Sequence, residues 1–186
     1  MLNAVSIWLP KMLEAKKYDL LIYNKIMWDK PQTEHQLKNP ILQQLDDLGI
    51  SYREIIYGQY NEDEYYAALQ QCHGMIFLCD HESQGFACCE ALSMNIPVLA
   101  WDQGYWLDPN RLKWGETVVP ATSVPWFDER CGMTFKNIDE FNNQVKPFME
   151  KLKNEGFNPR EYILENLTLK ISARKMLEII NNIYHN

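Results

Sequence analysis

The chain has 186 residues, a formal net charge of −7 and 46% hydrophobic residues, enough for one compact domain whose core needs no disulfide or metal. It contains no basic run, so the electrostatic footprint of a nucleic-acid-binding protein is missing. No apolar run reaches the roughly 18 residues of a membrane span, and residues 1–17 lack the basic start of a signal peptide.

The cysteines and histidines predict neither disulfides nor a metal site. Five cysteines include no Cys-x-x-Cys pair, and their odd number favours reduced thiols. The four histidines show no metal-ligand spacing either. We therefore expect a cytoplasmic protein without a metal ion or a resident cofactor.

Apolar strands that alternate with amphipathic helices predict an α/β fold, a doubly wound, Rossmann-like parallel sheet with helices on both faces. In the first half we expect strands at 19–23 and 52–57 and helices at 34–48 and 61–71. Pro40 predicts that the first helix is kinked or split. Asn61 and Glu64 have the spacing of a capping box at the start of the second helix.

The central strand is expected at 74–79 (GMIFLC), because a continuously apolar run is typical of a strand buried on both faces. A buried helix at 85–94 follows, then a strand at 98–101. Asn95 occupies the position of a left-handed terminating residue, and Pro97 prevents the helix from continuing.

The rest of the chain is predicted to be loop-rich at first and helical at its end. We expect short strands at 117–119 and 133–135, a helix at 139–153, a helix start at Asn158 and Pro159, and a last helix with an apolar stripe that includes Leu169 and Ile180. The domain is expected to span 18–186. Residues 1–17 are interpreted as a remnant or linker in which Trp8, Leu9 and Met12 need cover.

Two acids, Glu82 and Glu90, flank the start of the helix that follows the central strand. The backbone amides of Gly85 and Phe86 are expected at the N-terminus of this helix, where unpaired N–H groups and the helix dipole favour a diphosphate. In an open α/β sheet, ligands bind in this crevice beyond the carboxyl ends of the strands. Glu90 lies about 7.5 Å along the axis from Gly85, at about 1.5 Å per residue.

The stretch from Asp80 to Trp101 (DHESQGFACCEALSMNIPVLAW) resembles the E-x7-E signature of GT-B retaining glycosyltransferases, which lies in their C-terminal, nucleotide-sugar-binding domain. The sequence Glu-Ala at 90–91 and Pro-Val at 97–98 match the family pattern, and Asn95 stands where the family usually has glycine. Asparagine is the next-best residue at such a left-handed position.

This resemblance implies a role for each residue of the motif. Glu90 would accept hydrogen bonds from the ribose hydroxyls, and Glu82 would lie near the donor sugar as the candidate catalytic residue. Gly85 and Phe86 would offer backbone amides to sugar or phosphate. Without the resemblance, Glu90 reads as a satisfied helix glutamate and Glu82 as an exposed loop acid.

Three further residues match the family pattern. Lys25 and Lys30, after the first strand, have the spacing of the arginine and lysine that hold the donor diphosphate in the family. Two cations there would stabilise the leaving group, although lysine lacks the bidentate fork of arginine. The alternative is a pair of ordinary surface lysines. Tyr60 would either stack on the nucleotide base or anchor its loop.

The resemblance implies transfer of a glycosyl group from a nucleotide sugar with retention of configuration and without a divalent metal. The family places its active site between two Rossmann-like domains, and we expect the acceptor-binding domain to be supplied by a longer chain or by a partner subunit. Two alternatives are a non-catalytic nucleotide-sugar-binding module and a fragment of a GT-B-fold epimerase acting on a sugar nucleotide. A response regulator is a poor alternative, because Asn24 and Lys25 stand where its acidic cluster belongs.

Overall fold

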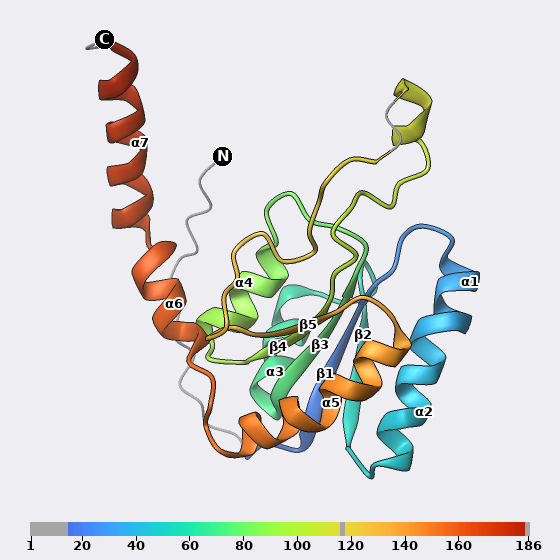
Figure 1. Ribbon diagram of the computed structural model, residues 1–186. Helices are drawn as coiled ribbons and strands as arrows, with labels where there is room; N and C mark the ends of the chain where they lie inside the picture. The colour runs from blue at the N-terminus through green and yellow to red at the C-terminus, as the bar shows by residue number, and fades with distance from the viewer. Residues whose placement is uncertain (1–14, 116–117, 185–186) are drawn as a thin grey trace.

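The computed structural model describes residues 15–115 and 118–184, and its centre is a five-stranded, all-parallel sheet in the order β2-β1-β3-β4-β5 (Figure 1). The strands are β1 (Tyr18–Lys25), β2 (Tyr52–Ile56), β3 (Cys72–Cys79), β4 (Val98–Trp101) and β5 (Gly132–Phe135). The predicted doubly wound, Rossmann-like α/β fold is therefore confirmed.

The helices connect these strands and extend beyond the last one. They are α1 (Lys30–Thr33), α2 (Asn39–Asp47), α3 (Glu62–Gln71), α4 (Phe86–Ser93), α5 (Ile138–Lys153), α6 (Pro159–Asn166) and α7 (Leu169–Tyr184). A π-helical segment, η1 (Glu34–Lys38), joins α1 to α2, and a 3-10 helix, η2 (Arg111–Trp114), lies in the long loop after β4.

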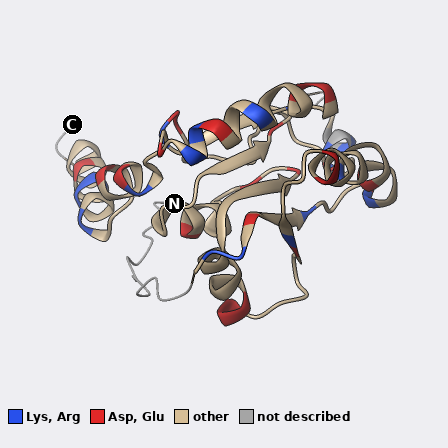
Figure 2. Cartoon of the chain, turned by 90° about the horizontal axis from the view of Figure 1, so that it is seen from below, with Lys and Arg blue, Asp and Glu red and all other residues tan. Residues whose placement is uncertain are grey.

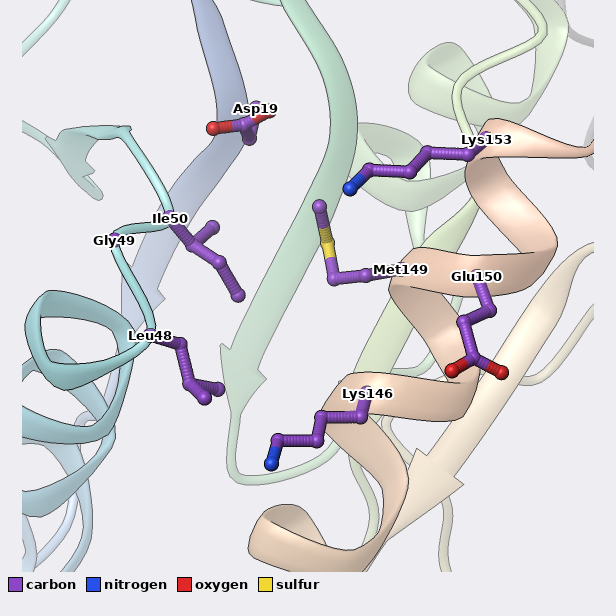
Figure 3. Close-up of a pocket in the computed structure, with 8 residues that line it drawn as sticks. All are labelled: Asp19, Leu48, Gly49, Ile50, Lys146, Met149, Glu150 and Lys153. Carbon is purple, nitrogen blue, oxygen red and sulfur yellow. The ribbon is translucent and has the colours of Figure 1, made fainter.

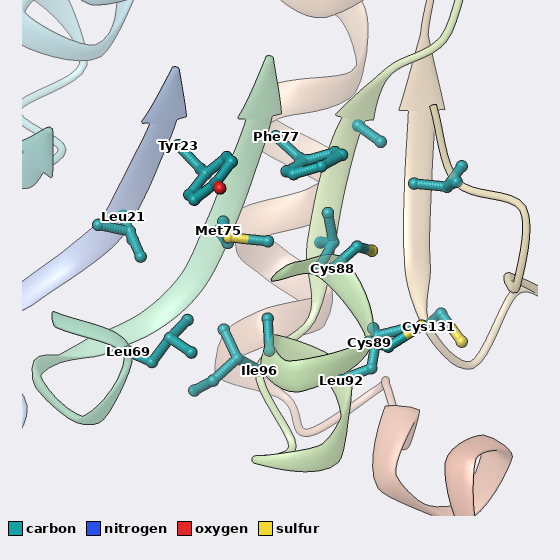
Figure 4. Packing of buried hydrophobic residues seen from close by; sticks show 14 of the residues in the cluster. Leu21, Tyr23, Leu69, Met75, Phe77, Cys88, Cys89, Leu92, Ile96 and Cys131 are labelled. Atoms are coloured by element: carbon teal, nitrogen blue, oxygen red, sulfur yellow. The ribbon is translucent and has the colours of Figure 1, made fainter. Parts of the chain in front are cut away.

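Two hydrophobic cores cover the two faces of the sheet. On one face, α3, α4 and α6 pack against residues of β1 and β3 such as Tyr23 and Phe77 (Figure 4). On the other face, α2 and α5 contribute residues such as Ile41 and Phe148. Because β1 and β3 are buried from both sides, their sequences are apolar without alternation, as the sequence predicted.

The first helical region differs in part from the helix at 34–48, kinked or split at Pro40, that was expected. It starts earlier, at Lys30, and the π-helical turn Glu34–Lys38 lies directly before Pro40. Proline has no N–H and its ring clashes with the carbonyl of an α-helical preceding turn, so a wider turn lets the chain continue without that clash. The expected break at Pro40 is thus a change of helix type.

The predicted strand at 117–119 is wrong for its described residues, since Val118 and Val119 form no strand. Thr117 lies outside the described residues. This segment instead pairs with the loop after β4. The backbone N–H of Trp106 donates a hydrogen bond to the Val119 carbonyl (2.8 Å), and Tyr105 and Pro120 form a single antiparallel bridge. The edge of β4 is occupied by β5 instead.

The ends of α4 have the backbone conformations that its sequence predicted. Gly85 precedes the helix with φ of +70°, and Asn95 follows it with φ of +60°. The capping box of α3 is also formed, because the Asn61 side chain accepts from the Glu64 N–H (2.9 Å) and the Glu64 carboxylate accepts from the Asn61 N–H (2.9 Å). The expected remnant with Trp8, Leu9 and Met12 lies outside the described residues.

Helix α7 projects away from the sheet and follows α6 at the end of the chain (Figure 1). Its apolar side chains are exposed, including Leu169 (62%), Leu177 (60%) and Ile183 (67%). Within the described part of the chain, no helix is long and apolar enough to cross a membrane.

Candidate functional site

The candidate site lies at the carboxyl ends of β1 and β3, where the order of the strands reverses. β1 pairs with β2 on one side and with β3 on the other, and Lys25 at the end of β1 is in register with Cys79 at the end of β3. A reversal of this kind opens a crevice beyond the two strands, which is where doubly wound folds bind ligands. A pocket of about 230 Å³ occupies this position.

The structure brings Lys25 and Glu82 together in this pocket. The Lys25 ammonium donates a hydrogen bond to the Glu82 carboxylate, and both side chains are largely buried, at 19% and 12% exposure. The same ammonium lies 4.7 Å from the centre of the Tyr57 ring. Burial alone would lower the pKa of Lys25, but the bond to Glu82 outweighs it and raises that pKa. Lys25 is therefore charged at neutral pH.

Glu90 lies within α4, does not line this pocket, and is held by a tyrosine. Its carboxylate accepts a hydrogen bond from the Tyr66 hydroxyl (3.1 Å), which also lies 3.0 Å from Glu62. Burial raises the pKa of Glu90, the bond from Tyr66 lowers it, and the nearby charge of Glu62 raises it further. The net shift is upward, which marks a carboxylate held where water solvates it poorly.

Gly85 separates the two acids and shapes the turn between them. Its left-handed backbone begins α4, and a side-chain carbon added there would meet Pro125 at 3.3 Å. Phe86, the first residue of α4, exposes 54% of its surface. The turn is therefore packed against Pro125 on the Gly85 side, while Phe86 faces solvent.

The structure does not place Lys30 in this pocket. Lys30 begins α1, after a loop in which Asp29 has φ of +45°, and it is not among the residues that line the pocket. The charge of Lys30 acts on Glu34, whose pKa is lowered first by a hydrogen bond from Asn24 and also by Lys38 and Lys30. The matching spacing of Lys25 and Lys30 does not bring them together here.

Tyr60 lies against the aromatic core beneath the site. Its hydroxyl is 2.5 Å from that of Tyr23, and its ring packs near those of Tyr23 (6.0 Å between centres) and Tyr65 (5.6 Å). These contacts are those of a loop anchor. A role in binding a nucleotide base stays a prediction.

The pocket is also lined by three residues outside the predicted set of site residues: Asp80, His81 and Trp106. The imidazole of His81 stacks on the indole of Trp106, with ring centres 3.8 Å apart. Asp80 is buried, and its Oδ2 accepts a hydrogen bond from the Met27 N–H (2.6 Å). A polar residue directly after a buried strand was a usable signal for Asp80 and His81. For Trp106 the only signal was its position in the loop after β4, because its partner His81 lies 25 residues away in the sequence.

The described residues contain no group of three or more His, Cys, Asp or Glu side chains that could hold a metal ion. All five cysteines are free and buried. Burial raises the pKa of Cys89 to about 12, so this thiol next to Glu90 stays protonated and is a packing residue.

The strand order and the flanking helices define a Rossmann-like domain, and comparison with solved structures shows that it has the fold of a GT-B glycosyltransferase domain. A TarM mutant from S. aureus, in complex with fondaparinux, alpha-GlcNAc-glycerol and UDP, superposes with a TM-score of 0.60 at 16% identity, over 96% of this chain. A second TarM structure gives a TM-score of 0.55 at 15% identity and the same coverage. The chain spans 38% of the length of either TarM chain.

No protein-family model matches the sequence. A search of curated proteins finds no match either. The likeness therefore establishes the fold, and the function is argued from the site.

Proposed function

We propose that this chain is the donor-binding domain of a GT-B retaining glycosyltransferase, which binds a nucleotide sugar between Lys25, Glu82, Glu90 and the start of α4. The observation that supports the proposal is the pairing of Lys25 with Glu82 in a pocket at the point where the strand order reverses, directly before α4, the helix that carries Glu90. The fold it shares with TarM, which was crystallised with UDP, supports the same ligand class.

The ion pair in the pocket gives the binding event a specific chemistry. In the free protein, the Lys25 ammonium is paired with the Glu82 carboxylate. A donor diphosphate offers Lys25 a stronger counter-charge, and its arrival releases the Glu82 carboxylate to accept a hydrogen bond from a sugar hydroxyl. Phosphate and sugar are thus recognised by two halves of one pair, while Glu90 accepts from the ribose hydroxyls.

Catalysis, in this proposal, requires a second domain that presents the acceptor. With it, the domain transfers the glycosyl group with retention of configuration, and no divalent metal is needed at the diphosphate. Lys25 and the N–H groups at the start of α4 meet the charge that develops on the leaving diphosphate. Glu82 is the candidate catalytic residue, through its place beside the sugar.

The test is calorimetric titration of the chain with UDP, GDP, ADP and their common sugar conjugates. We expect one nucleotide to bind, and Lys25→Ala and Glu90→Ala each to weaken it at least tenfold, the factor that about 1.4 kcal/mol from a charge-assisted hydrogen bond corresponds to. Thermal unfolding of each variant checks that it is folded.

Matched controls lie at the opposite end of the sheet. Lys146 and Glu150 on α5 line a separate pocket of about 330 Å³ near Asp19 at the start of β1 (Figure 3). Lys146→Ala and Glu150→Ala remove the same charges far from the crevice and should leave nucleotide affinity unchanged. A complete absence of nucleotide binding, or equal losses in the site and control variants, would overturn the proposed function.

A further inference from the structure

Three buried polar atoms of the candidate pocket have no hydrogen-bond partner among the described residues. They are Asp80 Oδ1, His81 Nδ1 and Trp106 Nε1. All three residues line the pocket of about 230 Å³ at the ends of β1 and β3. An unpaired buried polar group costs about 1–3 kcal/mol, so three of them in one pocket require a compensating partner.

The three side chains are held in place by other contacts. The second oxygen of Asp80 accepts from the Met27 N–H (2.6 Å), which ties the carboxylate to the loop after β1. The stacked rings of His81 and Trp106, tilted by 32°, restrict each other's rotation. The unpaired atoms are therefore part of a preformed arrangement, which lowers the entropy that a ligand loses on binding there.

The chemistry of these atoms selects the kind of ligand. The indole N–H of Trp106 only donates, and a carboxylate oxygen of Asp80 accepts. Burial lowers the pKa of His81, so its neutral ring offers one donor and one acceptor nitrogen. Hydroxyl groups satisfy all three, because each can donate and accept. A phosphate oxygen only accepts, and Asp80 would repel its charge.

The size of the pocket limits the ligand further. About 230 Å³ lies below the roughly 300–1,000 Å³ of sites for drug-sized molecules. The pocket therefore suits a single ring rather than a whole nucleotide. It is bounded by Lys25 and Glu82, so a ring inside it would lie next to a diphosphate held at Lys25.

We propose that Asp80, His81 and Trp106 form the subsite that binds the hydroxyl-bearing ring of the donor sugar and that they determine which sugar is accepted. This inference rests on the proposed function, which it deepens. The hydroxyl pattern of the sugar must present a donor to Asp80 and an acceptor to Trp106 at the same time. The stacked pair forms one wall of the subsite.

The first test follows the indole N–H signal of Trp106 by ¹⁵N–¹H NMR, assigned with Trp106→Phe. The probes are the nucleoside diphosphates, their sugar conjugates and the corresponding free monosaccharides at millimolar concentration. We expect this signal to shift with a sugar conjugate or a free sugar and to shift less with the plain diphosphate. The signal of Trp126 is the control, because its Nε1 is equally buried and unpaired but lies outside the pocket.

The second test compares affinities in two matched variants. Trp106→Phe keeps a ring for stacking and removes the N–H, so it should weaken the sugar conjugate about tenfold relative to the plain diphosphate, the loss expected for one hydrogen bond with its partner left unpaired. Trp126→Phe should change neither affinity.

The outcomes separate the subsite from the proposed function. Nucleotide binding without any sugar-dependent response of Trp106 leaves the function standing and overturns the subsite, since water alone then satisfies the three atoms. A response to free sugars without nucleotide binding keeps the subsite and overturns the function. An equal response to diphosphate and sugar conjugate overturns the subsite, because phosphate then fills the pocket.

Discussion

The carboxylate of Glu90 shows how burial of a single ionisable side chain opposes folding at neutral pH. It is half-buried and accepts a hydrogen bond from the Tyr66 hydroxyl, which lies close to Glu62 as well. Burial raises the pKa of Glu90 despite that bond. A carboxyl group that holds its proton more tightly in the folded state stabilises the protein below its ordinary pKa and loses that contribution as the pH rises.

The raised pKa of Glu90 predicts the effect of Glu90→Gln on stability. Glutamine is neutral and still accepts from Tyr66, so the variant should be more stable than the wild type at pH 7, by up to about 1 kcal/mol. The advantage should shrink as the pH falls toward the ordinary glutamate pKa of about 4.3. Urea unfolding of both proteins between pH 7 and about 4.5 measures the difference. A variant that is less stable at pH 7, or a difference that does not vary with pH, would contradict this account.

At the same scale, the sequence predicted some of the residues that meet but not how they pair. The family pattern placed Lys25, Lys30, Glu82 and Glu90 at one crevice, and the pocket there is lined by Lys25 and Glu82 but not by Lys30 or Glu90. The contacts of Glu82 with Lys25 and of Trp106 with His81 depend on side-chain rotamers and on a loop that returns to the site. Neither contact can be predicted from the local sequence.

At the scale of the secondary-structure elements, α4 is bounded at both ends by a residue with a left-handed backbone. Asn95 ends the helix with φ of +60°, and its side chain accepts from the Arg160 N–H (3.3 Å), which links α4 to α6. Local sequence was sufficient to predict this boundary, because Asn followed shortly by Pro is typical of a helix end. It was insufficient at Pro40, where a break and a π turn satisfy the same constraint.

Two substitutions at Asn95 separate backbone strain from the side-chain contact. Asn95→Ala should destabilise the protein by about 1–2 kcal/mol, the cost of a left-handed conformation for a residue with a β-carbon and no local hydrogen bond. Asn95→Gly should cost at most a few tenths of a kcal/mol, because glycine adopts this conformation freely. Chemical denaturation of the three proteins gives the comparison. Equal losses in both variants would show that the bond to Arg160 outweighs the backbone term.

At the scale of the whole molecule, the sheet and its two cores form one unit, and α7 stands apart from it. Seven of its apolar side chains are at least two-fifths exposed: Leu169, Met176, Leu177, Ile179, Ile180, Ile183 and Tyr184. Its charged residues of both signs, like those of α5, are visible in Figure 2. The sequence predicted the apolar stripe but not that it would remain uncovered in this chain.

This separation predicts two levels of backbone protection. Amide hydrogens of β1 and β3 are buried in the central strands and should exchange only when the whole domain unfolds, whereas those of α7 should exchange through local opening. Hydrogen–deuterium exchange of the chain should therefore show α7 exchanging at least tenfold faster than the central strands. Equal protection of α7 and β3 would indicate that α7 is covered in solution.

The strand order also has a consequence for the way the chain folds. β1 is first in sequence, yet its partner β3 lies more than fifty residues later, as the pairing of Lys25 with Cys79 shows. During synthesis β1 can join only β2, and the second edge of β1 stays unpaired until β3 has emerged. Closing this long loop is the slow, entropy-limited step. The crevice that holds Lys25 and Glu82 is created in that same step, so the candidate site and the centre of the sheet form together.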